Sequence, residues 1–252
     1  MSIEEIFSKR RQIRSAWDQT RLPSKETIKN LLERTMKIAP SKQNVYPFKI
    51  HAFGPNDKKE RNIISQICCL FTHGAANNFQ DDELTRQKLG ETNKDAPWVL
   101  VFELRKCEPN TFIKEHSREF NDWTRFTQVD ERFRESSNRT LAAIEVGMFT
   151  KCLAGLCLEN DLAISYIKSF PEWTWKGQRN EYSKDINKVG LSWDSLPQIT
   201  EAPLLVVQIG YKADMVDLLA STVEVDGVIH STKGGVFLED KPSIDEIVQF
   251  KD

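Results

Sequence analysis

The chain has 252 residues, of which 39% are hydrophobic and 29% are charged, a balance that excludes a disordered or fibrous protein. Its 35 basic residues are matched by 37 acidic ones, so the net charge of -2 leaves no general positive surface for nucleic acid. The 11 glycines are too few to favour a glycine-rich phosphate loop, and no GxGxxG, GxxxxGK[ST], GxSxG or HExxH motif occurs. Any anion site must therefore be local.

The start of the chain and its five cysteines favour a cytoplasmic protein. The first residues lack the basic and then apolar pattern of a secretory signal. The cysteines show no CxxC or Cys/His ligand spacing, which favours buried free thiols in a reducing compartment, and the four histidines are isolated, so we predict no metal site. The longest apolar helix candidate, residues 141–158, is interrupted by Glu145 and Lys151, so we predict no membrane span.

Helix signals occur at several places in the chain. Capping boxes at Ser2-x-x-Glu5 and Ser243-x-x-Glu246 open two short helices, one near each end. Between them, apolar residues repeat at intervals of three and four, which is the spacing of one helix face. The last of these stretches is so apolar that we expect burial on more than one side. In chain order, helices are predicted over residues 3–9, 25–37, 63–71 and 136–159, and from residue 243 onward.

Strand signals alternate with these helices. A continuous apolar run, residues 97–102, lies between charged segments and predicts a buried central strand. Asp226-Gly227 between valines predicts a tight hairpin. Residues 72–95 are polar and weakly periodic, and they are predicted to be a loop with room for a short helix. Strands are predicted over residues 48–52, 97–102, 162–167 and 204–210. Because no repeat or low-complexity linker divides the chain, we predict a single α+β domain over residues 1–252.

Two blocks near the N-terminus, separated by one predicted helix, carry the most specific pattern. The first is Arg10-Arg11-Gln12-Ile13-Arg14, and the second is Ala39-Pro40-Ser41-Lys42-Gln43-Asn44-Val45-Tyr46-Pro47-Phe48. Their order resembles the opening of the FMN-dependent nitroreductase family, which reads Arg-x-Ser-x-Arg, a helix, Ala-Pro-Ser-x-x-Asn-x-Gln-Pro-Trp and a strand. Ala96-Pro97, the segment 162–170 and Gly210-Tyr211 resemble later parts of the same pattern, so the resemblance spans roughly residues 3 to 211.

The resemblance implies a nitroreductase-like fold. Such a fold has a central, mostly antiparallel sheet flanked by helices, with a long buried core helix, and it forms a homodimer with its sites at the dimer interface. Residues 212–252 would then be a C-terminal extension involved in the dimer. The resemblance also makes Phe120, Trp123 and Phe126 candidates for a mobile lid from the partner chain; packing under a loop is the alternative for these three residues.

The resemblance assigns the first block to the FMN phosphate, and the residue types suit that role. Guanidinium groups grip phosphate oxygens with paired, charge-assisted hydrogen bonds. Arg10 and Arg14 lie four residues apart and would share one face if the helix continues, whereas Arg11 would point elsewhere, to the ribityl chain or the pyrimidine edge. Gln12 stands where the family has serine, beside the phosphate.

The resemblance assigns the second block and a later turn to the flavin. Asn44 offers both a donor and an acceptor, which suits ribityl hydroxyls or flavin carbonyls, and Ser41 could bond either the cofactor or its own helix end. Lys168 and Ser169 occupy the turn whose backbone N–H approaches flavin N5 in the family. The implied activity is ping-pong transfer of hydride from NAD(P)H through FMN to a nitroaromatic, quinone or similar aromatic acceptor, with no side-chain acid or base required.

Three departures from the pattern keep alternatives open. Gln12 replaces serine, Tyr46 replaces glutamine, and the basic residues that the family places after Gly-Tyr have only Lys212 and Lys233 as counterparts. Arg86 and Lys88 are candidates for a mid-chain flavin contact. A degenerate family member that binds flavin or a partner without efficient turnover is therefore the second hypothesis, and an α+β domain of unrelated function is the third.

Overall fold

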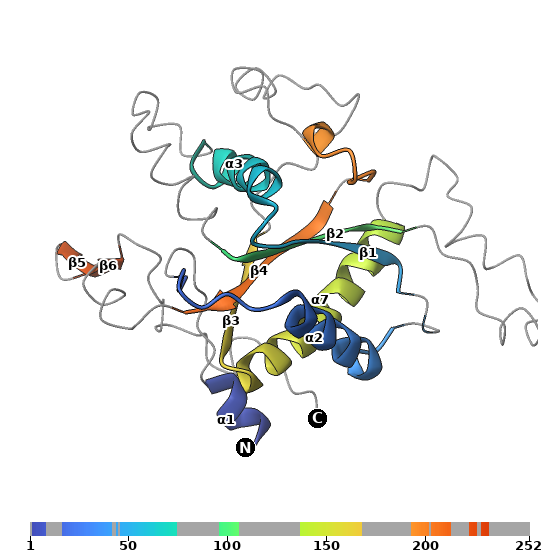
Figure 1. The fold of residues 1–252 in the computed structure, drawn as a ribbon, viewed down its shortest axis with the longest axis horizontal. Helices are drawn as coiled ribbons and strands as arrows, with labels where there is room; N and C mark the ends of the chain where they lie inside the picture. The colour runs from blue at the N-terminus through green and yellow to red at the C-terminus, as the bar shows by residue number, and fades with distance from the viewer. Residues whose placement is uncertain are drawn as a thin grey trace, which may run out of the picture.

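The centre of the molecule is a four-stranded antiparallel sheet with the strand order β1-β2-β4-β3 (Figure 1). Its strands are β1 (Phe48–Phe53), β2 (Trp98–Leu104), β3 (Leu162–Ile167) and β4 (Pro203–Tyr211). This is a computed structural model, and it describes residues 2–8, 17–41, 44, 46–74, 96–105, 137–167, 193–201, 203–212, 222–225 and 228–231. The predicted antiparallel sheet and all four of its strands are confirmed.

The two inner strands, β2 and β4, are mostly apolar because both of their faces are covered. Leu100 and Phe102 of β2 face one side of the sheet, and Val99 and Val101 face the other, with all four side chains buried. Burial of such side chains is the main source of stability in a domain of this size. The prediction of a buried central strand is therefore confirmed, and the strand continues two residues further than predicted, to Leu104.

One face of the sheet is covered by two helices, α2 (Lys25–Ile38) and α7 (Ser137–Glu159) (Figure 1). Ser24 caps α2, since its side chain accepts a hydrogen bond from the Thr27 amide. The two helices bury apolar side chains against β2 and β4, and Phe149 of α7 lies at the centre of an aromatic cluster. An exposed ion pair between Arg34 and Glu159, at 2.6 Å, joins the two helices.

The opposite face is covered by α3 (Lys58–Gly74), with the short helix η3 (Trp193–Ser195) beside it (Figure 1). The buried Arg61 of α3 donates to the backbone oxygens of Pro55 and Ala96, and it thereby joins the turn after β1 to the start of β2. The helix begins five residues before the predicted start at residue 63, because its first turn is polar and carries no apolar repeat. Residues 72–74, predicted as loop, belong to α3, and residues 75–95 lie outside the described residues.

The first helix, α1 (Ile3–Ser8), forms as its capping box predicts. The Ser2 amide donates to Glu5 Oε2 at 2.6 Å, and the Glu5 amide donates to Ser2 Oγ at 3.1 Å. Two β-strands, β5 (Thr222–Val225) and β6 (Val228–Ser231), pair on either side of the predicted Asp226-Gly227 turn. The helix predicted from residue 243 lies outside the described residues, and the assignment of residues 212–252 to a dimer extension stays a prediction.

The long helix α7 is less enclosed than predicted. Its inner side is fully packed, but Leu141, Ile144 and Met148 stay exposed at 42%, 54% and 36% along its N-terminal half. Phe7 of α1 packs on Gly155 further along. Among the described helices, the stretch Arg139–Glu159 is long and apolar enough to cross a membrane, but a helix that packs in a protein core, as this one packs on the sheet and on α2, has the same length and composition.

Candidate functional site

The described residues of the second sequence block form a turn that leads from α2 into β1. Ala39 ends α2, and its amide donates to the Thr35 carbonyl. The Asn44 amide donates to the Ser41 carbonyl at 3.0 Å, and Asn44 and Tyr46 both have left-handed backbone conformations, with φ of 55° and 48°. Such conformations are uncommon for side chains other than glycine and are costly for a large ring. The turn must therefore be held by its surroundings.

The Ser41 hydroxyl supplies one of these restraints. It donates to Glu145 Oε2 on α7 at 2.7 Å, and it accepts from the Tyr46 amide at 2.9 Å. A hydroxyl has one proton, so Ser41 cannot also donate to a cofactor while it is bonded to Glu145. One lone pair remains for an acceptor role. The predicted alternative, a bond to its own helix end, is not what the structure has; the hydroxyl instead bonds the turn and the neighbouring helix.

Tyr46 supplies the second restraint. Its hydroxyl points back to the last turn of α2 and lies 2.6 Å from the Met36 carbonyl and 3.1 Å from the Ala39 carbonyl. Its ring packs edge-on against Phe48 and Phe149. Burial, with a smaller contribution from Glu145 and then Cys152, raises the pKa of Tyr46, so the hydroxyl keeps its proton for these bonds. This gives a physical reason for the departure from the usual glutamine: the tyrosine anchors the turn.

Glu145 is the residue of this region that the sequence patterns missed as a partner. They treat it only as a charge that interrupts an apolar helix. In the structure it lies on the same side of α7 as Ala142 and Phe149, and it is only 7% exposed. Its spacing from these residues, three and four positions, would have placed it on the buried face. A buried acid in an apolar helix needs a polar partner, but the serine that bonds it lies 104 positions away.

Asn44 is arranged differently from Ser41 and Tyr46, because it is exposed. Its side chain carries a carbonyl acceptor and an amide donor, and its backbone is fixed by the turn. An exposed amide on a fixed backbone is suited to bind the hydroxyls or carbonyls of a flavin nucleotide. Within the described residues, Asn44 therefore fits the cofactor that the sequence implies, and the donor of Ser41 is already engaged. Contact of either residue with FMN stays a prediction.

Most of the other predicted site residues lie outside the described residues. These are the phosphate candidates Arg10, Arg11, Gln12 and Arg14, the turn residues Lys168 and Ser169, the loop candidates Arg86 and Lys88, the residue Lys233 and the aromatic trio Phe120, Trp123 and Phe126. Their roles stay predictions.

The described residues beyond the arginine block connect two of the later sequence signals. Trp17 forms a bridge with Lys212, and the Asp18 amide donates to the Tyr211 carbonyl at 2.9 Å. A Cβ on Gly210 would lie 2.5 Å from Pro97 and 2.9 Å from the Trp17 ring, so this close approach requires glycine. The Ala96-Pro97 and Gly210-Tyr211 signals thus meet in space beside the chain that follows Arg14. Lys212, one of the predicted C-terminal basic residues, lies there and is exposed.

A second buried carboxylate, Glu103 at the end of β2, lies on the α3 face of the sheet. Its oxygens are 2.9 Å from His51 Nε2 and 3.5 Å from Lys49 Nζ, both on β1. They also accept hydrogen bonds from the amides of Thr200 and Glu201, at 2.9 and 3.2 Å. Burial alone would raise the pKa of Glu103, but the nearby His51 and these two amides outweigh burial and lower the pKa to about 2. This carboxylate fastens the segment before β4 to the sheet.

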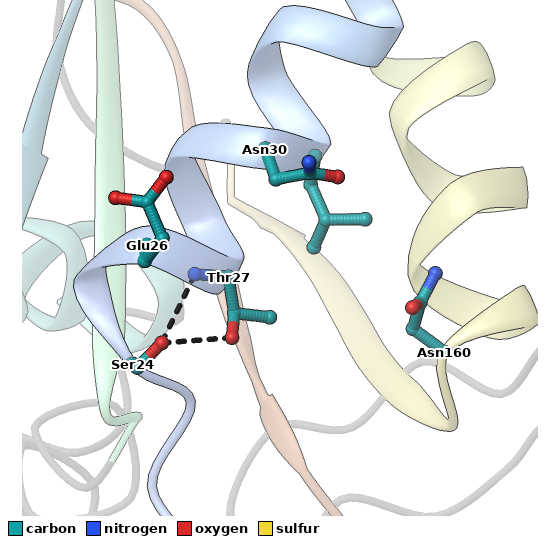
Figure 2. A pocket seen from close by; sticks show the side chains of 6 residues that line it. Ser24, Glu26, Thr27, Asn30 and Asn160 are labelled. Atoms are coloured by element: carbon teal, nitrogen blue, oxygen red, sulfur yellow. Dashed lines mark hydrogen bonds between the residues drawn. The ribbon is translucent and has the colours of Figure 1, made fainter.

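The remaining polar features of the described residues offer no ligand site. A hollow of about 310 Å³ lies between the first half of α2 and the turn after α7 (Figure 2). Its polar groups serve the helices: Ser24 caps α2, and the Asn160 side chain donates to the Leu156 carbonyl at 2.7 Å. In the part of the chain that the structure describes, no three His, Cys, Asp or Glu side chains gather as a metal site would require. The thiol of Cys157 is buried, which raises its pKa to about 12 and makes it unreactive, as the cysteine pattern predicts.

Comparison with known proteins agrees with the sequence pattern. A model of the nitroreductase family matches residues 7–211. That range contains both N-terminal blocks and ends at the Gly210-Tyr211 signal. Among curated proteins, no relative matches the chain.

Solved structures share the fold at low sequence identity. A nitroreductase-like protein from Streptococcus mutans has a TM-score of 0.56 at 12% identity, with 98% of this chain and 97% of that chain covered. A candidate NAD(P)H:FMN oxidoreductase from Staphylococcus epidermidis has a TM-score of 0.53 at 13% identity, with 99% and 96% covered. A nitroreductase-like protein from Bacillus cereus has a TM-score of 0.51 at 14% identity, with 100% and 97% covered. The fold extends over almost the whole chain in each case.

Proposed function

The chain belongs to the nitroreductase family of flavin oxidoreductases, and from that premise we propose that it transfers hydride from NAD(P)H through FMN to an aromatic acceptor. Nitroaromatics and quinones are the acceptor classes that the resemblance implies. The observation that carries the proposal is the family match over residues 7–211, which includes every residue that the sequence assigns to FMN. The candidate NAD(P)H:FMN oxidoreductase of the same fold supports the choice of cofactor and electron donor.

Different residues of this chain would bind different parts of FMN. The guanidinium groups of Arg10 and Arg14 would hold the phosphate, with Arg11 and Gln12 beside them. The amide of Asn44 would bond the ribityl chain or the ring. The backbone at Lys168 and Ser169 would donate near N5. When bound, FMN supplies the hydride acceptor and donor chemistry, and the protein supplies orientation and charge.

We also propose that the site is shared between two copies of the chain. The Arg105 amide bonds the Pro47 carbonyl, which places the turn of Asn44 near the C-terminal end of β2. Trp17, which follows the arginine block, lies at the opposite end, because its bridge partner Lys212 follows β4 and Trp98 pairs with Ile209. Seven strand residues separate these ends, a span of roughly 20 Å. This separation supports a homodimer in which the turn of one copy completes the phosphate site of the other.

The second candidate is a flavin-binding protein with little turnover. Two observations favour it: Gln12 replaces the family's serine beside the phosphate, and the hydroxyl of Ser41 donates within the protein. The first replaces a small hydroxyl beside the phosphate by a longer amide, and the second leaves Ser41 without a proton to donate to FMN. We propose for either candidate a cytoplasmic protein with a small aromatic ligand, with no nucleic acid or membrane as partner.

A redox cycle followed by absorbance separates the two candidates. The purified protein mixed with FMN should turn yellow, lose its colour when NADH or NADPH is added without oxygen, and regain it when a quinone is added. Stable colour with both nucleotides would favour the second candidate. A protein that takes up no FMN would overturn both.

A matched variant tests the phosphate assignment. The double variant Arg10→Ala/Arg14→Ala should weaken FMN binding by about 3–6 kcal/mol, because each charge-assisted hydrogen bond contributes about 1.5–3 kcal/mol. Unchanged affinity in a fluorescence titration would place the phosphate elsewhere. Arg21→Ala is the control. Arg21 is paired with Asp18 at 2.6 Å, so its replacement should leave FMN affinity unchanged.

A further inference from the structure

We infer that Glu145 is a positioning residue, which acts through Ser41 to hold the turn that presents Asn44 to the flavin. The inference rests on the proposed function, because it assigns a role in binding FMN. It concerns three described residues that come together from two separate parts of the chain. Glu145 itself lies on the buried side of α7 and is not proposed to contact the cofactor.

The carboxylate of Glu145 is buried on the inner side of α7. Glu145 is 7% exposed, and its neighbours on the inner side of α7, such as Ala142 and Phe149, are buried apolar residues. An apolar residue would pack at this place without the cost of removing a carboxylate from water. Packing alone therefore does not explain why an acid occupies this position. Its bond to the Ser41 hydroxyl, at 2.7 Å, shows which part of the molecule it restrains.

The backbone of the turn is strained. Asn44 and Tyr46 have φ of 55° and 48°, so both are held in the left-handed region, which residues other than glycine rarely adopt. The bond from the Tyr46 amide to Ser41 Oγ, at 2.9 Å, closes the turn across these residues. Because the same oxygen donates its proton to Glu145, the carboxylate fixes the direction in which Ser41 can accept. Strained backbone that is held by surrounding groups is typical of binding sites.

The side chain of Asn44 lies on the outside of the turn. Ser41 and Tyr46 use their polar groups inward, on Glu145 and on the end of α2, whereas the side chain of Asn44 is exposed. A turn fixed from the inside gives an exposed amide one orientation before the ligand arrives. Such preorganisation increases affinity because less freedom is lost on binding. The structure thus assigns Glu145 to the orientation of Asn44.

The test uses the full chain and FMN itself, in a fluorescence-quenching titration. Ser41→Ala/Glu145→Leu replaces both partners of the bond with apolar groups of similar size. It also removes the acceptor of the Tyr46 amide, but the Tyr46 hydroxyl still bonds the end of α2, so the protein should still fold. We expect the FMN dissociation constant of this variant to rise about tenfold, with the melting temperature of the FMN-free protein lowered by only a few degrees. A structural role alone would change the melting temperature and leave FMN affinity as it is.

A coupling measurement shows whether the effect passes through Asn44. Asn44→Gly removes the amide and tolerates the left-handed backbone. On its own it should also raise the dissociation constant about tenfold. Added to Ser41→Ala/Glu145→Leu, it should cause no further rise, because the amide that the turn presented is gone. Effects that multiply to about a hundredfold would overturn the inference.

Two further variants control for charge and for the helix. Glu145→Gln keeps an oxygen that can accept from Ser41, and it should restore FMN affinity to within about threefold of the unaltered protein. Glu159→Gln removes a carboxylate from the same helix without touching the turn and should leave the affinity unchanged. Normal affinity in Ser41→Ala/Glu145→Leu overturns this inference alone. If the unaltered protein binds no FMN, the proposed function and this inference fall together.

Discussion

Glu103 and Glu145 are both buried carboxylates, but they are held in different ways on opposite faces of the sheet. Glu103 has two basic side chains and two backbone amides around it, and its pKa falls to about 2. Glu145 receives the hydroxyl of Ser41, at the base of a strained turn. The first is compensated like a structural ion pair, whereas the second restrains a segment that exposes a binding group. Burial alone therefore does not show whether an acid has a structural or a functional role. The groups that bond the carboxylate show which role it has.

The largest expected effect on folding is the loss of Glu103. Glu103→Ala should lower the free energy of unfolding by about 3 kcal/mol, because removal of one partner of a buried pair leaves the others uncompensated. Urea unfolding of the FMN-free protein, followed by circular dichroism, measures this. Glu103→Gln keeps the shape and should lose less. A loss under about 1 kcal/mol for the alanine variant would mean that the segment before β4 is held by other contacts.

Acid should remove the contribution of Glu103 in a defined window. Its pKa falls from an ordinary value of 4.5 to about 2 in the folded state, so its stabilising effect is complete above pH 4.5 and is lost as the pH falls toward 2. The gap in unfolding free energy between the unaltered protein and Glu103→Gln should therefore narrow over this range. A gap that is constant from pH 6 to pH 2 would contradict the account.

Removal of Glu145 should have an intermediate effect on stability. Glu145→Ala leaves the Ser41 hydroxyl without this acceptor and empties space beside Phe149, so we expect a loss of about 2 kcal/mol. Ser41→Ala/Glu145→Leu should lose less, about 1 kcal/mol, because the hydroxyl is removed together with its acceptor and the Tyr46 amide is the group that loses a bond. Urea unfolding of both variants checks the difference. Equal losses would make Glu145 a structural residue like Glu103.

The smallest effect is expected for the exposed carboxylate on the same helix. Glu159 pairs with Arg34 at 2.6 Å, but about half of each side chain is exposed. Exposed pairs contribute about 0.2–1 kcal/mol, so Glu159→Gln should lower the unfolding free energy by less than about 1 kcal/mol. This loss should shrink further in 0.5 M salt, because screening weakens exposed pairs. A loss as large as that of Glu103→Ala would show that exposure is a poor guide to these carboxylates.

Local signals predicted much of the fold. The capping box at Ser2 and Glu5 involves residues three positions apart and forms as predicted. The helix predicted from residue 25 begins at Lys25, where Ser24 caps it. The apolar run of β2 identified the central strand. The end of that strand was missed because Glu103 is charged, and the His51 that compensates it comes from another strand. The exposed face of α7 was also missed, since composition alone does not say which side of a helix is covered.

The site was less predictable than the fold, because its residues are held by contacts between distant parts of the chain. The chemistry of Asn44 follows from its residue type and from the family pattern, but its exposure follows from the turn. That turn depends on Tyr46, which reaches back to Met36, and on Glu145, which lies 104 residues from Ser41. Sequence spacing carries no signal for a contact of that kind. The arginine block and the turn at Lys168 stay predictions.

The most direct test of the central claim is the binding of FMN by the full chain. The protein should be incubated with excess FMN, passed through a gel-filtration column, and scanned from 300 to 550 nm. The account predicts a yellow protein peak that carries about one FMN per chain and elutes at the size of a dimer. A colourless protein peak, with all of the FMN eluting later as free nucleotide, would contradict it.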